Sequence, residues 1–219
     1  MKNGQTRYIV SSEDFEKFLG RLPTFGEPIQ QYEQYNTPIT LIKRLLQIVE
    51  LNDIEFSKML DLGCGVGRIG LAFAKYYPSA QIIGIDISPQ AVLSAVKFRK
   101  QEKLSNIQFI VTPLEFFETS YYHKLHYKHS IVVMNPPFGV YHKGIDMLFL
   151  RKALECAKNV IGIFKSHPSL RTILNREISA FNAHLEVYKD VFPIKKQPKY
   201  EKHKKPIHNV EIDICYFSR

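Results

Sequence analysis

The sequence of 219 residues lacks the features of membrane and exported proteins. No apolar run approaches the roughly 20 residues that a membrane-spanning helix needs. The N-terminus carries acidic residues early and has no apolar core of a secretory signal, so we expect a cytoplasmic protein with no membrane partner. There is no internal repeat and no low-complexity segment, and the length favours one well-buried domain with a short extension.

Cysteine is scarce, which argues against disulfide and zinc-ribbon frameworks. Cys64, Cys156 and Cys215 lie far apart and form no Cys-x-x-Cys pair, so we expect reduced thiols. Histidines recur at every third position in the segment 121–129, YYHKLHYKH, which is the one pattern that invites a metal interpretation. Lysines rather than cysteines or carboxylates lie between His123, His126 and His129, so we expect a solvated loop and no metal.

Positive charge is in excess, with a formal net charge of +9 and an isoelectric point near 9.3. Such an excess favours polyanionic partners, nucleic acid among them. Seven lysines fall between Lys189 and Lys205, and Tyr200 and His203 stand among them. We interpret this segment as a phosphate-binding surface, with a merely soluble loop as the alternative.

Short apolar runs alternate with longer amphipathic stretches from about residue 58 to residue 165. This alternation is typical of a parallel sheet covered by helices on both faces, so we expect an α/β, doubly wound fold. Two later runs, separated by the lysine-rich segment, suit an antiparallel pair at one edge of the sheet. The expected strands are 59–60, 81–85, 107–111, 131–134, 160–164, 185–192 and 210–217.

Proline positions indicate where helices begin and end. Ser88-Pro89 predicts the start of a helix that runs to about Glu102, and Tyr77-Pro78 closes the helix before it. Thr37 and Pro38 are predicted to be the N-cap and the first residue of another helix, because apolar residues follow them at helical spacing. We therefore expect an N-terminal helical cap over residues 1–55 and the sheet domain over residues 56–219.

A glycine-rich turn, DLGCGVGRIG at residues 61–70, follows the first expected strand. Gly65, Gly67 and Gly70 match the dinucleotide pattern Gly-x-Gly-x-x-Gly, and Asp86 lies about 20 residues further on. The same residues also match Asp-x-Gly-x-Gly-x-Gly, which begins at Asp61 and is the pattern of S-adenosylmethionine sites. The turn could also serve packing alone.

The two cofactors make different demands on this turn. A dinucleotide places its pyrophosphate at a helix N-terminus, whereas S-adenosylmethionine has no phosphate and carries an ammonium group that an acid must neutralise. Asp61 can supply that acid, and Gly63 and Gly65 would let the backbone close over the methionine portion. Asp86 can accept hydrogen bonds from two ribose hydroxyls in either case. We therefore favour S-adenosylmethionine.

The segment VVMNPPFG at residues 132–139 ends the fourth expected strand, because a Pro pair cannot continue a central strand. Its position is the edge at which doubly wound sheets hold ligands. An adenine amine is a poor nucleophile, and two acceptors that fix its N–H bonds would assist its methylation. Asn135 Oδ1 and the Pro136 carbonyl can be those acceptors, Pro137 stiffens the loop, and Phe138 can stack on the base. The alternative is a tight turn with a core Phe.

Together the glycine turn and Asn-Pro-Pro-Phe resemble the class I amino-methyltransferases that act on adenine N6, cytosine N4 or the glutamine amide. The segments YEQYNTP (32–38), 135–150, FKS (164–166) and 199–214 resemble more closely the methyltransferase-like protein five family of archaea and eukaryotes. This resemblance implies a seven-stranded Rossmann-like sheet. It also implies S-adenosylmethionine-dependent methylation of the N6 amine of an adenosine in small-subunit ribosomal RNA.

The resemblance also implies roles for individual residues. Asn135, Pro136, Pro137 and Phe138 would hold the adenine. RNA would contact Lys165 and the loop residues Lys202, His203, Lys204 and Lys205. The cofactor would lie against Gln34, Tyr35, Thr37, Asp61, Gly63, Gly65, Asp86, Ile87 and Asn135.

The chain departs from the class I pattern after the third strand, where Pro113 stands in place of the usual acid. Glu115 or a carbonyl near Leu114 could take over its contact with the cofactor.

The third strand itself, residues 106–111, is apolar and free of Lys and Pro, so it can pair with another chain. The resembling family binds a small zinc-ribbon activator, and we expect it at this edge.

Two other functions remain open at this point. One is methylation of a glutamine amide in a protein, although the basic segment gives it no support. The other is a non-catalytic RNA-binding subunit, against which Asp61 and Asn135 argue.

Overall fold

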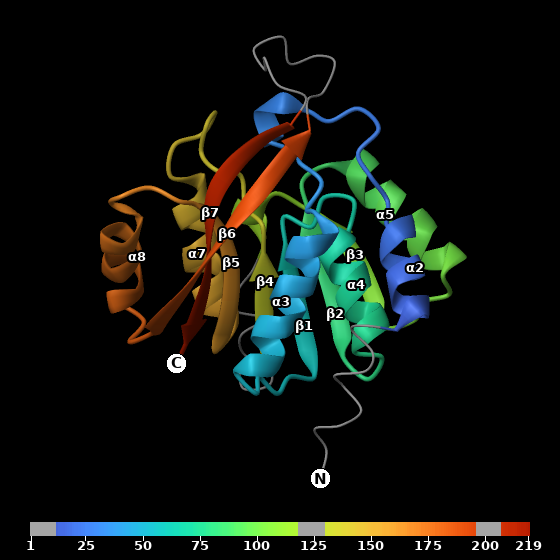
Figure 1. Ribbon diagram of the computed structural model, residues 1–219, viewed down its shortest axis with the longest axis horizontal. Coiled ribbons are helices and arrows are strands. Elements are labelled where there is room, and N and C mark those ends of the chain that lie inside the picture. The colour runs from blue at the N-terminus through green and yellow to red at the C-terminus, as the bar shows by residue number, and fades with distance from the viewer. Residues whose placement is uncertain (1–11, 118–129, 196–206) are drawn as a thin grey trace.

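The computed structural model describes residues 12–117, 130–195 and 207–219 (Figure 1). Its strands form one seven-stranded sheet in the order β3-β2-β1-β4-β5-β7-β6. The pairs among β1 to β5 are parallel, and β7 runs antiparallel to both β5 and β6. The expected doubly wound α/β fold is confirmed. The strands are β1 Lys58–Leu62, β2 Gln81–Asp86, β3 Ile107–Val111, β4 Ser130–Met134, β5 Asn159–Lys165, β6 His184–Lys195 and β7 Ile207–Ser218.

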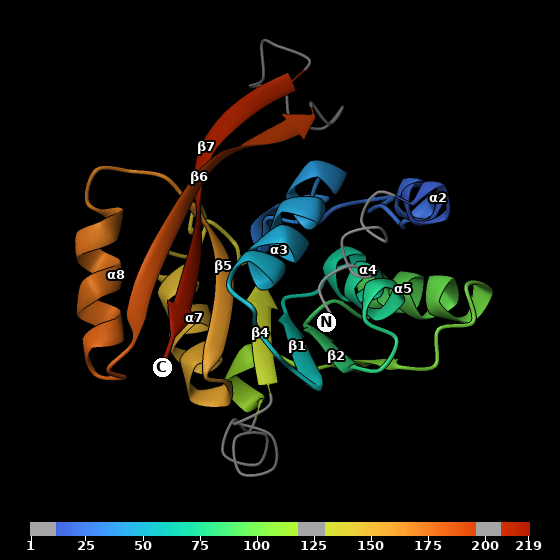
Figure 2. The same ribbon diagram turned by 60° about the horizontal axis from the view of Figure 1, so that its bottom comes forward.

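The antiparallel hairpin of β6 and β7 is longer than the strand beside it. β5 pairs with β7 only from Ile212 to Ser218, so the first part of β7 pairs with β6 alone. Figure 2 shows the two strands continuing past the end of β5. The described part of the hairpin therefore extends beyond the carboxyl end of β5.

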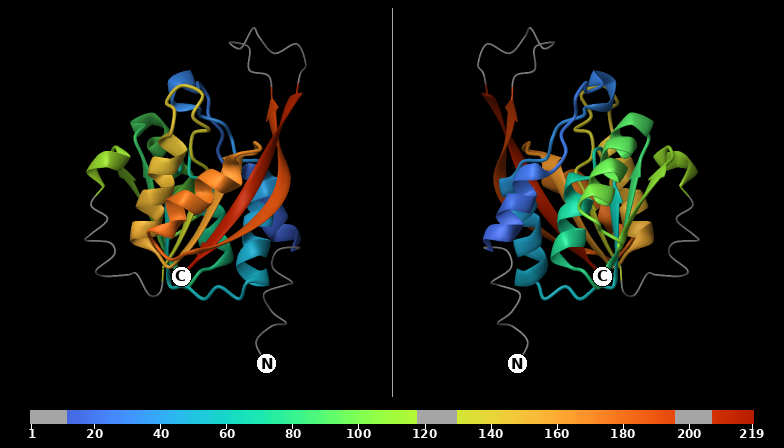
Figure 3. Two further views of the ribbon diagram at one scale, coloured as in Figure 1. Left: turned by 90° about the vertical axis from the view of Figure 1, so that its left-hand side faces the viewer. Right: turned by 90° about the vertical axis from the view of Figure 1, so that its right-hand side faces the viewer.

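Helices cover both faces of the sheet, and two apolar clusters lie between them and the strands. One cluster includes side chains of α2, α3, α4 and α5, and the other includes side chains of α7 and α8. Figure 3 shows α3 and α7 on opposite sides of the sheet. The helices are α2 Glu13–Arg21, α3 Ile39–Leu51, α4 Arg68–Tyr76, α5 Pro89–Gln101, α7 Ile145–Cys156 and α8 Leu170–Ser179, with short 3-10 turns η1 Gln30–Tyr32 and η2 Leu114–Phe116.

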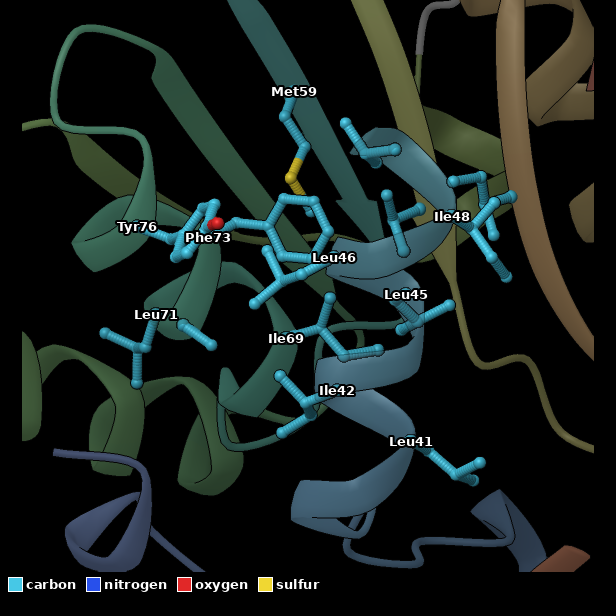
Figure 4. Packing of buried hydrophobic residues seen from close by; sticks show 14 of the residues in the cluster. Leu41, Ile42, Leu45, Leu46, Ile48, Met59, Ile69, Leu71, Phe73 and Tyr76 are labelled. Atoms are coloured by element: carbon cyan, nitrogen blue, oxygen red, sulfur yellow. The ribbon is translucent and has the colours of Figure 1, made fainter. Parts of the chain in front are cut away.

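The N-terminal helices share the core of the sheet. Figure 4 shows Ile42 and Leu46 of α3 facing Ile69 and Phe73 of α4, with Met59 of β1 beside them. These side chains are buried because the apolar residues of α3 recur at helical spacing on one face. Within the described residues, no helix combines the length and apolar character that a bilayer crossing requires.

Two of the expected helix starts have different outcomes. Ser88 caps α5 as expected, since its Oγ accepts a hydrogen bond from the Ala91 amide at 3.4 Å. The expectation for Thr37 was wrong, because α3 begins at Ile39 with Pro38 in the N-cap position. The Thr37 hydroxyl accepts a hydrogen bond from the Asn135 side chain instead. Thr37 thus joins the start of α3 to the loop after β4.

Candidate functional site

A cavity of about 340 Å³ lies where β1, β2 and β4 end. These strands are neighbours in the sheet, so the loops that follow their carboxyl ends meet at one edge. The N-terminal segment before α3 and Phe192 of β6 complete its wall. Residues from segments 25–37, 63–69, 85–87, 112–115 and 135–149 line the cavity.

Asp86 at the end of β2 holds the glycine turn. Its Oδ2 accepts a hydrogen bond from the Gly65 amide at 2.7 Å, and its Oδ1 accepts one from the Ser88 amide at 2.8 Å. Burial nevertheless raises the pKa of the carboxyl above its ordinary value. Asp86 and the neighbouring Ile87 both line the cavity, as the sequence predicted for cofactor-binding residues.

Gly63 and Gly65 adopt positive φ values of 69° and 54°, which favour glycine. A Cβ on Gly63 would lie 2.9 Å from the Phe149 ring, and a Cβ on Gly65 would lie 2.7 Å from the Phe25 ring. The sequence analysis attributed the need for glycine to the cofactor. The structure adds another reason, because the chain's own aromatic rings occupy the space of a side chain.

Asp61 lies behind the glycine turn rather than in the wall of the cavity. It is 1% exposed, and its Oδ2 accepts a hydrogen bond from the Gly70 amide of α4 at 2.8 Å. Its Oδ1 is buried and has no hydrogen-bond partner among the described residues. Burial raises the pKa of the carboxyl to about 7. Asp61 therefore anchors the first turn of α4, and its contact with a cofactor stays a prediction.

The side-chain amide of Asn135 has a partner for its nitrogen but none, among the described residues, for its oxygen. Its Nδ2 donates to the Thr37 hydroxyl at 3.0 Å, whereas its Oδ1 is buried and has no partner among the described residues. Pro136, Pro137 and Phe138 line the cavity beside it. A buried acceptor without a donor is costly, which is typical of an atom reserved for a ligand.

The segment 33–37 forms the roof of the cavity through polar contacts. The Gln34 side chain accepts a hydrogen bond from the Ile29 amide at 2.8 Å, and Tyr35 lines the cavity with Gln34 and Thr37. Arg68, at the start of α4, is buried and donates to the carbonyl of Thr37 at 2.8 Å. Burial lowers the pKa of its guanidinium. The segment 33–37, which was expected to lie over the cofactor, is thus joined by the Arg68 hydrogen bond to the helix that follows the glycine turn.

Several residues of the site were missed by the sequence analysis. Glu33 accepts hydrogen bonds from the loop after β4, and the Phe192 ring meets the Phe138 ring edge-on, with centroids 5.9 Å apart. Phe25 and Phe149 crowd the glycine turn, and Arg68 fixes the roof. None of these residues belongs to a local motif of its own. Glu33 and Phe149 stood within segments that carried the resemblance, and Arg68 stood within the glycine-rich turn.

Residues near Pro113 that line the cavity could take the place of the acid that the class I pattern has at this position. Thr112, Leu114 and Glu115 line the cavity, and Pro113 does not. The Glu115 side chain is exposed, so it can turn toward a ligand. These positions are consistent with either substitute named from the sequence.

The basic residues predicted to contact RNA do not line the cavity within the described part of the chain. Lys165 is exposed at the carboxyl end of β5. Lys202, His203, Lys204 and Lys205 lie outside the described residues, as does the segment 121–129 with its three histidines. Within the described residues, no cluster of potential ligands could hold a metal ion.

Comparison with known proteins identifies the family. A model of the methyltransferase small domain matches residues 42–202, which is more than half of the chain. The chain belongs to the methyltransferase small domain family. The match covers the glycine turn, the loop after β4 and β6, and it ends before β7.

Relatives extend the similarity to almost the whole chain. The rRNA N(6)-adenosine-methyltransferase METTL5 of Danio rerio is 28% identical over 94% of this chain and 98% of its own length. METTL5 of Drosophila melanogaster is 27% identical over 92% of this chain and 93% of its own. These matches confirm the resemblance that the motifs indicated. A release factor glutamine methyltransferase of Fusobacterium nucleatum is 29% identical but matches 55% of this chain and 33% of its own length.

Solved structures share the fold. The crystal structure of a putative RNA methyltransferase from Pyrococcus horikoshii has a TM-score of 0.78 and 24% identity, and covers 98% of this chain and 96% of that one. The methyltransferase domain of METTL16 has a TM-score of 0.64 and 15% identity, covering 93% and 91% of the two chains. Both likenesses support the seven-stranded class I methyltransferase sheet.

The buried carboxyl of Asp61 predicts a pH-dependent stability. Its pKa is raised in the folded chain to about 7 from an ordinary value of 3.8, so between these values the folded chain binds more protons than the unfolded chain. Its contribution therefore favours folding at low pH and is lost as the pH rises through 7. Asp61→Asn keeps an acceptor for the Gly70 amide and does not titrate. We expect its unfolding free energy relative to the natural chain to increase from pH 4 to pH 7, measured by urea titration; a constant difference would contradict this.

Proposed function

We propose that the chain is an S-adenosylmethionine-dependent methyltransferase that methylates the N6 amine of an adenosine in structured RNA, with small-subunit ribosomal RNA in the cytoplasm as the substrate. The observation that carries this proposal is the buried, unpartnered Oδ1 of Asn135 at the end of β4. It lies in a cavity that an aromatic ring, Phe138, also lines. The printed functions of the relatives that match almost the whole chain support the same assignment.

The wall of the cavity fits the proposed cofactor. Asp86 retains acceptor capacity for ribose hydroxyls beside its two amide contacts, and Ile87 offers an apolar surface next to it. The buried carboxyl of Asp61, behind the turn, would become ionised beside the ammonium group of the cofactor, because a nearby positive charge lowers a carboxyl pKa. Gln34, Tyr35 and Thr37 would cover the opposite side. When bound, S-adenosylmethionine supplies an electrophilic methyl group.

The chain would orient the adenine amine rather than deprotonate it. Asn135 Oδ1 accepts one N–H of the amine, and the bond from its Nδ2 to Thr37 fixes which side of the amide faces the substrate. The Pro136 carbonyl accepts the second N–H, because a carbonyl before Pro137 makes no strand pairing. Orientation of this kind lowers the barrier without a strong base, since the amine loses its proton readily once it is methylated.

The two aromatic rings at the cavity would hold the base. Phe138 is partly buried and can stack on a flat ring, which contributes about 1–3 kcal/mol per base. The Phe192 ring supports Phe138 from the side, at an interplanar angle of 87°. Because Phe192 lies on β6, this contact joins the adenine pocket to the hairpin that carries the lysine-rich segment.

RNA would approach along the β6–β7 hairpin. The net charge of +9 favours a polyanion, and the hairpin extends beyond the carboxyl end of β5, where Lys165 is exposed. The loop residues Lys202, His203, Lys204 and Lys205 would contact phosphates of the RNA. We also propose that residues 1–55 act as a helical cap on a methyltransferase domain of residues 56–219, a division supported by the packing of α2 and α3 on that domain's core.

A partner protein at the β3 edge is a further part of the proposal. β3 is the terminal strand of the sheet, and Ile110 and Val111 are 42% and 47% exposed on it. Phe116 of η2 is 78% exposed close by in the sequence. An apolar edge strand can accept another strand, and we propose a small zinc-ribbon activator protein as the occupant.

Replacement of Asn135 tests the proposed chemistry. Asn135→Ala should lower turnover on RNA by about 100-fold or more, because the acceptor acts on the amine in the transition state. The affinity for S-adenosylmethionine, measured by calorimetry, should stay nearly unchanged. Gln101→Ala, which removes an exposed amide on α5, is the control. Turnover by Asn135→Ala at the level of this control would contradict the mechanism.

Removal of the loop lysines tests the RNA surface. Replacing Lys202, Lys204 and Lys205 together by Ala should weaken RNA binding and flatten its salt dependence by roughly 0.7–0.9 log units per lost phosphate contact. Cofactor affinity should not change. The matched variant removes three exposed lysines elsewhere, at Lys97, Lys100 and Lys158. Equal salt slopes for the two triple variants would show that the loop serves solubility.

Charges on the β3 edge test the partner. Phe109 is unsuitable for this test, because its ring lies against Gly84 in the core. Lys at both Ile110 and Val111 should abolish association with the zinc-ribbon protein, followed by light scattering on the co-purified pair, and should leave cofactor affinity unchanged. An isolated chain that is monodisperse, stable and fully active would contradict the proposed partner.

A further inference from the structure

Glu33 has a buried carboxylate that binds the backbone of the loop after β4. The residue is 7% exposed and ends η1 in the left-handed region, at a φ of 48°. Its Oε2 accepts a hydrogen bond from the Phe138 amide at 2.8 Å. Its Oε1 accepts from the amides of Val140 at 2.7 Å and Tyr141 at 3.2 Å. One side chain thus engages three backbone donors.

These three amides need a partner that regular structure does not provide. They follow the proline pair and lie between β4 and α7, outside any helix or strand. Their hydrogen bonds to Glu33 are partly buried, and an ionised carboxylate is a strong acceptor for such N–H groups. The proline pair prevents β4 from continuing its strand pairing. The Glu33 carboxylate therefore accepts the hydrogen bonds that a neighbouring strand would otherwise accept.

The loop is held at two points by one short segment. Thr37 accepts a hydrogen bond from the Asn135 side chain at 3.0 Å, and Glu33 accepts from the amides that follow Pro137. Arg68 fixes the Thr37 carbonyl from the side of the glycine turn. Arg68 therefore anchors the segment 33–37, and this segment in turn holds the loop after β4 in place.

We propose that Glu33 is a positioning residue for methyl transfer. Its carboxylate holds residues 138–141 so that the Asn135 acceptor and the Phe138 ring keep a fixed relation to the adenine. This proposal rests on the function proposed above. Within the described residues Glu33 has no ion pair with Lys or Arg, so its role depends on acceptor geometry and not on a salt bridge.

The substitution Glu33→Gln tests the role of the two acceptor oxygens, because it changes them and preserves the size of the side chain. A Gln has one acceptor oxygen and one NH₂ donor in place of two acceptors. Whichever way the amide lies, its NH₂ faces at least one of the three backbone donors. Glu33→Asp keeps both acceptors on a side chain that is one methylene shorter. We expect the Asp variant to lie between the natural chain and the Gln variant in every measurement.

The first measurement is hydrogen exchange at the amides of Phe138, Val140 and Tyr141. Exchange in Glu33→Gln should be faster by about tenfold or more, because charge-assisted hydrogen bonds are lost. Exchange at the Gly65 amide, which Asp86 binds, should stay unchanged. Glu27→Gln is the matched control, since Glu27 is an exposed acid in the same segment of the chain.

The second measurement is the kinetics of methyl transfer to RNA. Glu33→Gln should lower kcat by about 100-fold, the loss expected when reacting groups are misplaced by about 1 Å. The Kd for S-adenosylmethionine should stay within about twofold of the natural value. A purely structural role would instead lower kcat, cofactor affinity and the unfolding temperature together.

Two results would overturn the proposal. One is natural exchange rates at the three amides in Glu33→Gln, which would show that Glu33 does not hold the loop. The other is faster exchange with an unchanged kcat, which would show that holding the loop does not serve the reaction. Absence of methyl transfer to RNA by the natural chain would overturn the proposed function, and the exchange rates would still decide whether Glu33 holds the loop.

Discussion

The site depends on how the backbone after β4 is held, because a proline pair follows this fully buried central strand after one residue, Asn135. Such a segment cannot continue the sheet, and its remaining N–H groups need acceptors from elsewhere. The chain provides them from the segment before α3, through Glu33, while Thr37 binds the Asn135 side chain. The same segment forms the roof of the cavity. A constraint of backbone hydrogen bonding thus joins the loop after β4 to the wall of the cavity.

Buried charged side chains in this site bind backbone groups rather than one another. Glu33, Asp61 and Asp86 each accept hydrogen bonds from amides, and Arg68 donates to carbonyls. Long-range contacts of this kind fix loops without a hydrophobic core around them. They also leave the unpartnered oxygens of Asp61 and Asn135 as the acceptors available near the cavity. The electrostatic pattern is therefore suited to a ligand that brings donors and positive charge.

The strands and the glycine turn could be predicted because their signals are local. β-Branched runs such as Ile131 to Val133, and the spacing of Gly63 and Gly65, report their own environment. The antiparallel hairpin followed from the same periodicity, whereas the position of β3 at the sheet edge followed from the resemblance to methyltransferases. Local patterns failed for Thr37, where a preference for capping a helix lost to a contact with Asn135, 98 residues away.

The part of the site that could not be predicted from the sequence consists of contacts between segments that are distant in the chain. Glu33 meets Phe138 across 105 residues, and the Phe25 and Phe192 rings reach the cavity from the N-terminal segment and from β6, far from the motifs in the sequence. No periodicity within one segment encodes such pairs, since each partner is ordinary in its own surroundings. The resemblance drew attention to residues 32–38, but only the folded chain shows that Glu33 binds the loop.

Nucleoside mass spectrometry of RNA treated with the purified chain and methyl-labelled S-adenosylmethionine tests the central claim most directly. The substrate is small-subunit ribosomal RNA that lacks the modification, with the proposed zinc-ribbon protein present in one arm and absent in the other. The account predicts label in N6-methyladenosine, and none when Asn135→Ala replaces the natural chain. Label on a glutamine of an added protein, or label in another nucleoside, or no transfer in either arm, would contradict it.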